Sequence, residues 1–205
     1  MDLRLLHACR SAVFSVPMDD AGPLAPIIDA LVGALRRHEV DHFITGSLAS
    51  SLHGEYRATR DIDVVADLSL EQLPGLVRDL EGDFFVDEAQ ARTAVAEGGS
   101  FNVVHHDSFF KVDLFPCASE FDREAMRRAE TFTLPGTSEG LRVTTAEDIL
   151  LAKLRWYRQG GEQSATQPRD IGQLIALNRP ELDWPYIERW AGRLGVTDLL
   201  SRFRA

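Results

Sequence analysis

The stretch FITGSLASSLHGEYRATRDIDVV, residues 43–65, decides how this chain folds. It opens with a short apolar strand that ends at Gly46. A short helix continues from Ser47 to about His53, and a second strand, rich in Ile and Val, follows over residues 61–66. A strand, a Gly-Ser turn, a helix and a second strand in this order predict an α/β unit.

Two carboxylates, Asp61 and Asp63, lie on that second strand. Residues two apart on a strand point to the same face, so these two side chains stand together while Ile62 faces the core. Two such charges repel each other unless a cation joins them, and Mg²⁺ prefers carboxylate and phosphate oxygens. The pair is therefore a candidate magnesium site, although a lone Asp-x-Asp is also common on solvated strand edges.

A third carboxylate, Asp113, lies on a strand that we expect over residues 109–115, FFKVDLF. It takes the polar position between Val112 and Leu114, on the same face as Lys111. If the two strands are neighbours, three carboxylates converge. Such a triad can hold two metal ions, one activating an acceptor hydroxyl and one carried by a triphosphate.

Gly46 and Ser47 lie where the first strand turns into a helix. Glycine lets the backbone approach a phosphate closely, and a helix N-terminus offers free N–H groups and a favourable dipole to an anion. The Ser47 hydroxyl adds a donor. An anion site next to a metal site is what phosphoryl or nucleotidyl transfer needs, because positioning and charge neutralisation dominate that catalysis.

The rest of the chain predicts further helices and strands by its apolar spacing. We expect helices over residues 24–35, 70–80, 121–129, 145–158, 168–178 and 183–195. We expect strands over residues 101–105, 109–115, 131–134 and 141–143, with a hairpin turn at Asp107-Ser108. The fold class is therefore α/β (α+β), with a core over residues 20–143 and a helical C-terminal part over residues 144–205.

Composition limits the classes of function. The chain has 205 residues and a formal net charge of −10, which argues against a protein that coats DNA by charge alone. Its two cysteines, Cys9 and Cys117, have no metal-ligand spacing and fit a reducing compartment. The N-terminus lacks a long apolar run, so we expect no signal peptide, no membrane span and a cytoplasmic location.

At these residues the chain resembles the polymerase β-like nucleotidyltransferase superfamily. Its signature is an apolar strand, Gly-Ser or Gly-Gly, a spacer, Asp-x-Asp or Asp-x-Glu, and a later single Asp, as in segments 43–65 and 109–115. The resemblance implies a mixed sheet flanked by helices, an NTP substrate and two Mg²⁺ ions. It also implies catalytic, metal-binding carboxylates at Asp61, Asp63 and Asp113, with Gly46 and Ser47 on the triphosphate.

The C-terminal part also carries a resemblance. The segments TTAEDILLAKLRWYRQGG, residues 144–161, and PRDIGQLI, residues 168–175, resemble the abortive-infection class of nucleotidyltransferases, some of which are toxins of toxin–antitoxin pairs. The resemblance implies that Lys153 holds triphosphate and that Asp170 belongs to the same site. The class often has a second Asp where this chain has Gln173.

Several of these residues have a second interpretation. Lys153 could be a snorkelling lysine at a helix edge, and Asp170 could simply complement a helix dipole. Lys111 could touch phosphate or only neutralise the carboxylates. Arg60 and its neighbour Arg57 could contact triphosphate or acceptor, and Arg60 could equally form a surface ion pair.

Other groups favour structural roles. His105 and His106 are adjacent on a strand and point to opposite faces, so they cannot chelate one ion together. Three arginines of one helix could meet an RNA acceptor, but a solvated helix face is the better interpretation: Arg123, Arg127 and Arg128. Four aromatic residues could stack on a nucleobase, but their helical spacing favours core packing: Trp156, Tyr157, Trp184 and Trp190.

The first functional hypothesis is a magnesium-dependent enzyme that moves a nucleoside monophosphate from an NTP such as ATP to a hydroxyl. The acceptor could be an RNA 3′ end, as in tRNA, a protein side chain or a small molecule, and the resemblance favours RNA and protein over an antibiotic-like acceptor. It also suggests a toxin–antitoxin role with an antitoxin partner. The alternative is a non-catalytic module that binds nucleotide or a partner with the same fold. The presence of all three carboxylates speaks for the enzyme.

Overall fold

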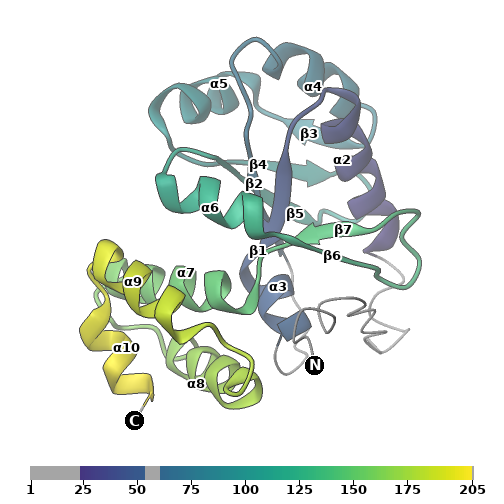
Figure 1. Ribbon diagram of the computed structural model, residues 1–205. Coiled ribbons are helices and arrows are strands. Elements are labelled where there is room, and N and C mark those ends of the chain that lie inside the picture. Colours follow the sequence, from purple (N-terminus) through teal and green to yellow (C-terminus); the bar gives the residue numbers. More distant parts are fainter. Residues whose placement is uncertain (1–23, 54–60, 205) are drawn as a thin grey trace, which may run out of the picture.

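The computed structural model describes residues 24–53 and 61–204. In these residues a seven-stranded mixed sheet has the order β3-β4-β5-β2-β1-β7-β6 (Figure 1). Two of the pairings are parallel, β2 with β5 and β1 with β7. The strands are β1 (His42–Thr45), β2 (Asp61–Ala66), β3 (Phe84–Val86), β4 (Phe101–His105), β5 (Lys111–Pro116), β6 (Glu130–Phe132) and β7 (Leu141–Val143).

Helices cover the sheet and extend beyond it. Helices α2, α4 and α5 pack on one face, and α6 lies on the other, while the last four helices gather beside the sheet, below α6 in Figure 1. Their bounds are α2 (Ala25–Arg37), α3 (Gly46–His53), α4 (Leu73–Leu80), α5 (Glu88–Glu97), α6 (Glu120–Arg128), α7 (Ala146–Gln159), α8 (Gln167–Asn178), α9 (Trp184–Leu194) and α10 (Thr197–Arg204).

Strand alternation decides which side chains enter the main core. On β2, Ile62 and Val64 are almost fully buried in one core cluster with residues of α2 and α4. On β5, Val112 and Leu114 are buried in the same cluster. The residues between them therefore point to the opposite face of the sheet. This face carries the carboxylates and is only partly covered, by α6 and α7.

The helices that follow β7 share contacts with the sheet. Thr145 caps α7 by accepting a hydrogen bond from the Asp148 backbone N–H, as its position before an apolar run predicts. The Asn178 amide at the end of α8 donates to the His53 carbonyl at 2.7 Å, which ties α8 to α3. Ile149 of α7 belongs to the same core cluster as the strands. The division at residue 143 stays a prediction.

The structure corrects several predicted elements. Strand β3 and helices α5 and α10 were not predicted. The β4–β5 turn is wider than Asp107-Ser108, because Phe109 has a φ of 55° and lies outside the strand predicted to include it. Strand β6 is shorter than the predicted 131–134. No helix of the described residues is long and apolar enough to cross a membrane.

Candidate active site

The strand register brings the predicted carboxylates together. Asp63 of β2 lies opposite Asp113 of β5 on one side and opposite Thr45 of β1 on the other. Asp61, two residues earlier, lies opposite Lys111. Neighbouring strands are about 4.8 Å apart. All these side chains point to the face opposite the main core, so the condition that the two Asp-bearing strands be neighbours is met.

The turn at Gly46 is built around Asp63. Gly46 has a φ of +66°, and a Cβ added there would lie 1.8 Å from Asp63 Oδ2. Only glycine fits, because it alone adopts this backbone at little cost and leaves room for the carboxylate. The backbone N–H of Ser47 donates to the Asp63 carboxylate. The N-terminus of α3 and the carboxylate row are thus in direct contact.

Charge accumulates at Asp63. Burial, followed by the negative charges of Asp61 and Asp113, raises the pKa of Asp63 to about 6. These effects outweigh the Ser47 N–H bond and the nearby Lys111 charge, which lower it. A divalent cation would relieve the like-charge repulsion, and carboxylate oxygens are its preferred ligands. The residues present therefore fit a Mg²⁺ ion.

Lys111 is the resident counter-ion of this row. Its Nζ lies 2.7 Å from Asp113 Oδ2, and this bond raises the pKa of Lys111. No three His, Cys, Asp or Glu side chains of residues 24–53 and 61–204 already converge as ligands of one ion. A metal ion would thus compete with Lys111 for Asp113. The Lys111 side chain is 44% exposed, so this pair contributes little stability and is replaceable.

A cavity of about 710 Å³ lies over this face, between the sheet, α6 and α7. That volume is in the range of small-molecule sites. Of the residues predicted for the site, four line it: Gly46, Ser47, Asp63 and Lys153. Asp61, Lys111 and Asp113 flank Asp63 on the same face without lining the cavity. Arg60, like Arg57, lies outside the described residues.

Lys153 and Asp170 form a pair. Lys153 is 4% exposed, and its Nζ lies 2.8 Å from Asp170 Oδ2, in the first turn of α8. Burying a lysine is costly unless a partner compensates its charge, and Asp170 does so. Asp170 does not line the cavity, but it binds the ammonium group of Lys153, a residue that does. The snorkelling interpretation of Lys153 is therefore wrong.

The aromatic residues separate into two groups. Trp190 and Tyr157 are buried among the C-terminal helices, as predicted. Trp156 is 55% exposed, lines the cavity and meets the Phe115 ring edge-on, with centroids 6.0 Å apart. Core packing was the wrong interpretation for Trp156, because this side chain leaves α7 on the face turned toward the cavity.

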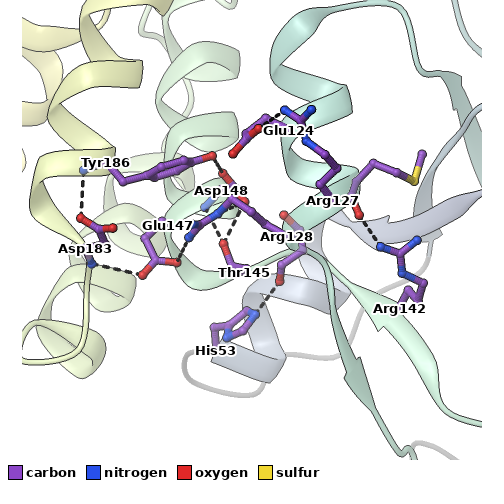
Figure 2. Close-up of polar contacts among 12 residues, drawn as sticks. His53, Glu124, Arg127, Arg128, Arg142, Thr145, Glu147, Asp148, Asp183 and Tyr186 are labelled. Carbon is purple, nitrogen blue, oxygen red and sulfur yellow. Dashed lines mark hydrogen bonds and ion pairs between the residues drawn. The ribbon is translucent and has the colours of Figure 1, made fainter. Parts of the chain in front are cut away.

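A second acidic residue near the cavity, Asp148, belongs to a buried network (Figure 2). Its carboxylate accepts from the Tyr186 hydroxyl at 2.5 Å, from Arg128 Nε at 3.1 Å and from the Thr145 hydroxyl at 2.9 Å. The Arg128 guanidinium lies 3.9 Å from the Tyr186 ring centroid and also contacts Glu147. This network joins α6, α7 and α9.

The network corrects the interpretation of one of the three arginines. Arg123 and Arg127 are exposed, as a solvated helix face predicts, whereas the half-buried Arg128 is bound by Glu147 and Asp148. Arg127 pairs with Glu124 on its own helix.

The two histidines contact different groups: His105 Nδ1 bonds the Ser108 hydroxyl at 3.0 Å, and His106 Nε2 bonds the Glu81 carbonyl at 3.1 Å.

One residue beside the carboxylates was not predicted. Asn102 of β4 lies directly opposite Asp113, so it extends the Thr45–Asp63–Asp113 row to a fourth strand. The available signal was its polar position between Phe101 and Val103, which are both buried. Alternation alone assigns Asn102 to the carboxylate face, but only the register places it next to Asp113.

No protein-family model and no curated protein matches this sequence. The structure, however, is similar to solved nucleotidyltransferases. An antigenic nucleotidyltransferase-like protein from Paracoccidioides brasiliensis is 21% identical, with a TM-score of 0.53 over 91% of this chain and 93% of that one. ANT(2″)-Ia in complex with adenylyl-2″-tobramycin is 15% identical, with a TM-score of 0.56 over 84% and 97%. The predicted nucleotidyltransferase-type fold is thus confirmed.

Proposed function

We propose that this protein is a metal-dependent nucleotidyltransferase that moves a nucleoside monophosphate from an NTP to a hydroxyl acceptor. The observation that carries the proposal is the row Thr45–Asp63–Asp113, which touches the Gly46-Ser47 turn at the edge of a cavity. It combines a place for cations with a helix N-terminus suited to phosphate. The nucleotidyltransferase-type fold supports the same chemistry.

Separate groups would bind the metal ions and the phosphates. Asp61, Asp63 and Asp113 would hold Mg²⁺, which, when bound, neutralises the triphosphate and activates the acceptor hydroxyl. The N-terminal end of α3, with the Ser47 hydroxyl, and the Lys153 ammonium would bind the β- and γ-phosphates that leave as pyrophosphate.

The acceptor oxygen forms its bond to the α-phosphorus as the bond to the β-phosphate oxygen breaks. Asp113 is the proposed group that takes the hydroxyl proton. Its carboxylate is the one that a cation would free from Lys111.

The acceptor classes to test are three. An RNA 3′ end, as in tRNA, and a protein side-chain hydroxyl follow from the resemblance to the abortive-infection class, as does an antitoxin partner. An aminoglycoside-like polyamine alcohol is the third, because the ligand of ANT(2″)-Ia is adenylyl-2″-tobramycin. The net charge of −10 suits a cationic small molecule better than a long nucleic acid.

A transfer assay tests the proposal. The protein is incubated with Mg²⁺ and each α-³²P-labelled NTP, in turn with total tRNA, with cell lysate protein and with tobramycin. The control is the Asp61→Ala/Asp63→Ala variant. Label on one acceptor class, absent with the control variant and after EDTA, supports the enzyme and names the base and acceptor. No label on any acceptor, with nucleotide binding intact, would contradict it.

The alternative, a non-catalytic nucleotide-binding or partner-binding module, is favoured by one observation. Asp113 already has a cation in Lys111, at 2.7 Å. If that ion pair is permanent, metal ions would not bind between Asp63 and Asp113. A Mn²⁺ titration followed by electron paramagnetic resonance separates the two proposals: saturable binding in wild type and none in Asp113→Asn supports the enzyme, and no binding in wild type supports the module.

A further inference from the structure

The end of the cavity away from the Gly46 turn is aromatic. Trp156 is one of five large apolar side chains that are exposed in the described part of the chain, and it alone among them lines the cavity. Its neighbour Tyr157 is buried in the helical core. An exposed indole in the wall of a cavity offers a flat apolar surface on which a ligand can pack.

An apolar floor lies under this end. Phe43, Val65 and Phe115 are register partners on β1, β2 and β5, one pleat beyond the Thr45–Asp63–Asp113 row. Two residues along a strand advance about 7 Å. All three line the cavity, and the Phe115 ring meets Trp156 edge-on. An apolar part of the cavity floor therefore begins about 7 Å along the strands from the carboxylates.

Helix α7 lines the cavity with side chains of three different kinds. Lys153 and Trp156 are three residues apart, which is about 4.5 Å along a helix, and both line the cavity. Gln159, three residues further, lines it too and carries an amide that can both donate and accept. One face of α7 thus offers, in order, a cation, an aromatic surface and a two-way hydrogen-bonding group.

We propose that Trp156 is the stacking surface for the nucleobase of the bound NTP and so favours nucleotides over polyphosphates without a base. This inference rests on the proposed nucleotidyltransferase function. A base is flat, has two π-faces and is joined through one ribose to the phosphates. Aromatic side chains stack on such rings, and this stacking depends little on which base is bound. The order cation, indole and amide along α7 matches triphosphate, base face and base edge.

Calorimetric titrations of two probes test the stacking. The first probe is α,β-methylene ATP, which cannot transfer its nucleotide, and the second is tripolyphosphate, which has no base; both are used with Mg²⁺. The variants are Trp156→Ala and Trp156→Phe. The matched control is Leu177→Ala, which removes a similarly exposed apolar side chain of α8 that does not line the cavity.

Stacking predicts that Trp156→Ala weakens α,β-methylene ATP by about 10-fold and leaves tripolyphosphate unchanged. Trp156→Phe should lose less affinity, and Leu177→Ala none. In wild type the nucleotide should also quench tryptophan emission, and in Trp156→Phe, where Trp184 and Trp190 remain, it should not.

The other outcomes are distinct. If both probes bind wild type and Trp156→Ala alike, the stacking is wrong and the proposed function stands. If Trp156→Ala weakens both probes equally, its role is to shape the cavity, which also overturns the inference. If neither probe binds wild type, the proposed function fails, and the inference fails with it.

Discussion

Two acidic residues near the same cavity, Asp63 and Asp148, both have raised pKa values but have neighbours of opposite effect. Burial is the largest cause for both. At Asp63 the next causes are two like charges, Asp61 and Asp113, which raise the pKa further. At Asp148 the next contributions come from Tyr186, Arg128 and Thr145, whose donors lower it.

The difference distinguishes a carboxylate suited to binding a cation from one that stabilises the fold. Asp148 has donors for both of its oxygens within the protein, so its carboxylate is part of the structure. Asp63 has a backbone N–H from Ser47 and otherwise an excess of negative charge, so a cation would complete it. Burial alone does not identify a functional carboxylate; the sign of its neighbours does.

The largest expected effect is on transfer by Asp63→Asn. The variant keeps the shape of the side chain and removes the charge that would bind Mg²⁺, so we expect the initial rate to fall about 10³-fold or more. Its melting temperature in EDTA should equal or exceed that of wild type, because a like-charge repulsion is gone. Asp67→Asn, an exposed residue just beyond β2, is the control and should change neither quantity.

Two outcomes for Asp63→Asn would contradict the distinction between Asp63 and Asp148. A large fall in the melting temperature of Asp63→Asn would mean that Asp63, like Asp148, supports the fold. A retained rate with an unchanged melting temperature would mean that the carboxylate row is not the site of transfer.

The second prediction concerns Asp148→Ala. Removing a carboxylate that is 1% exposed takes the acceptor of Tyr186 and Thr145 and one of the two carboxylates that bind Arg128. Breaking a buried charged pair costs about 3–5 kcal/mol, so the free energy of unfolding from urea titration should fall by about that amount. Tyr186→Phe removes one donor and should cost about 1.5 kcal/mol. Equal effects of the two variants would contradict a network centred on Asp148.

The third prediction tests the contact between the Gly46 turn and Asp63. Gly46→Ala places a methyl group 1.8 Å from Asp63 Oδ2 on a backbone with φ of +66°, so we expect a loss of about 2 kcal/mol or more in the free energy of unfolding. The matched control is Gly172→Ala. No atom lies within 4 Å of an added Cβ there, and α8 should gain about 0.5–1 kcal/mol. An equal gain in both variants would show that the turn tolerates a side chain.

Strand alternation predicted much of the carboxylate site. Alternation assigned Asp61 and Asp63 to one face of their strand, and Asp113 to the polar face of another strand. That Asp63 and Asp113 are direct neighbours was only a condition, since the register of two strands 50 residues apart depends on the whole sheet. Asn102 escaped notice for the same reason, because it enters the row only through β4.

The helical part was less predictable. Helical spacing finds the apolar side chains of α7, but it does not say which face meets the sheet, so Trp156 and Tyr157 received the same interpretation. Lys153 was assigned to triphosphate and Asp170 to the same site, while their mutual ion pair depends on how α7 and α8 pack. Strand β3, with three residues, is too short for a clear period.

The smallest expected effect comes from a third buried polar group, His42 of β1. Its Nδ1 contacts the Val40 carbonyl at 2.8 Å, and no partner for Nε2 lies among the described residues. Burial, which is the largest cause, holds the pKa of His42 below its usual value of 6.5. Asp148 has donors for both of its oxygens, and Asp63 would be completed by a cation. His42 is a third case, a ring that burial keeps neutral.

The sign of the pH effect follows from that lowered pKa. Below pH 6.5 the unfolded chain binds a proton at this residue more readily than the folded one, so stability is present above that pH and is lost as the pH falls. The slope is at most about 1.4 kcal/mol per pH unit for one group. His42→Gln, which does not titrate, should flatten the curve of unfolding free energy between pH 6.5 and 5 in parallel urea titrations. Identical slopes for variant and wild type would mean that His42 takes up its proton in the folded state, and that burial on β1 does not keep this ring neutral.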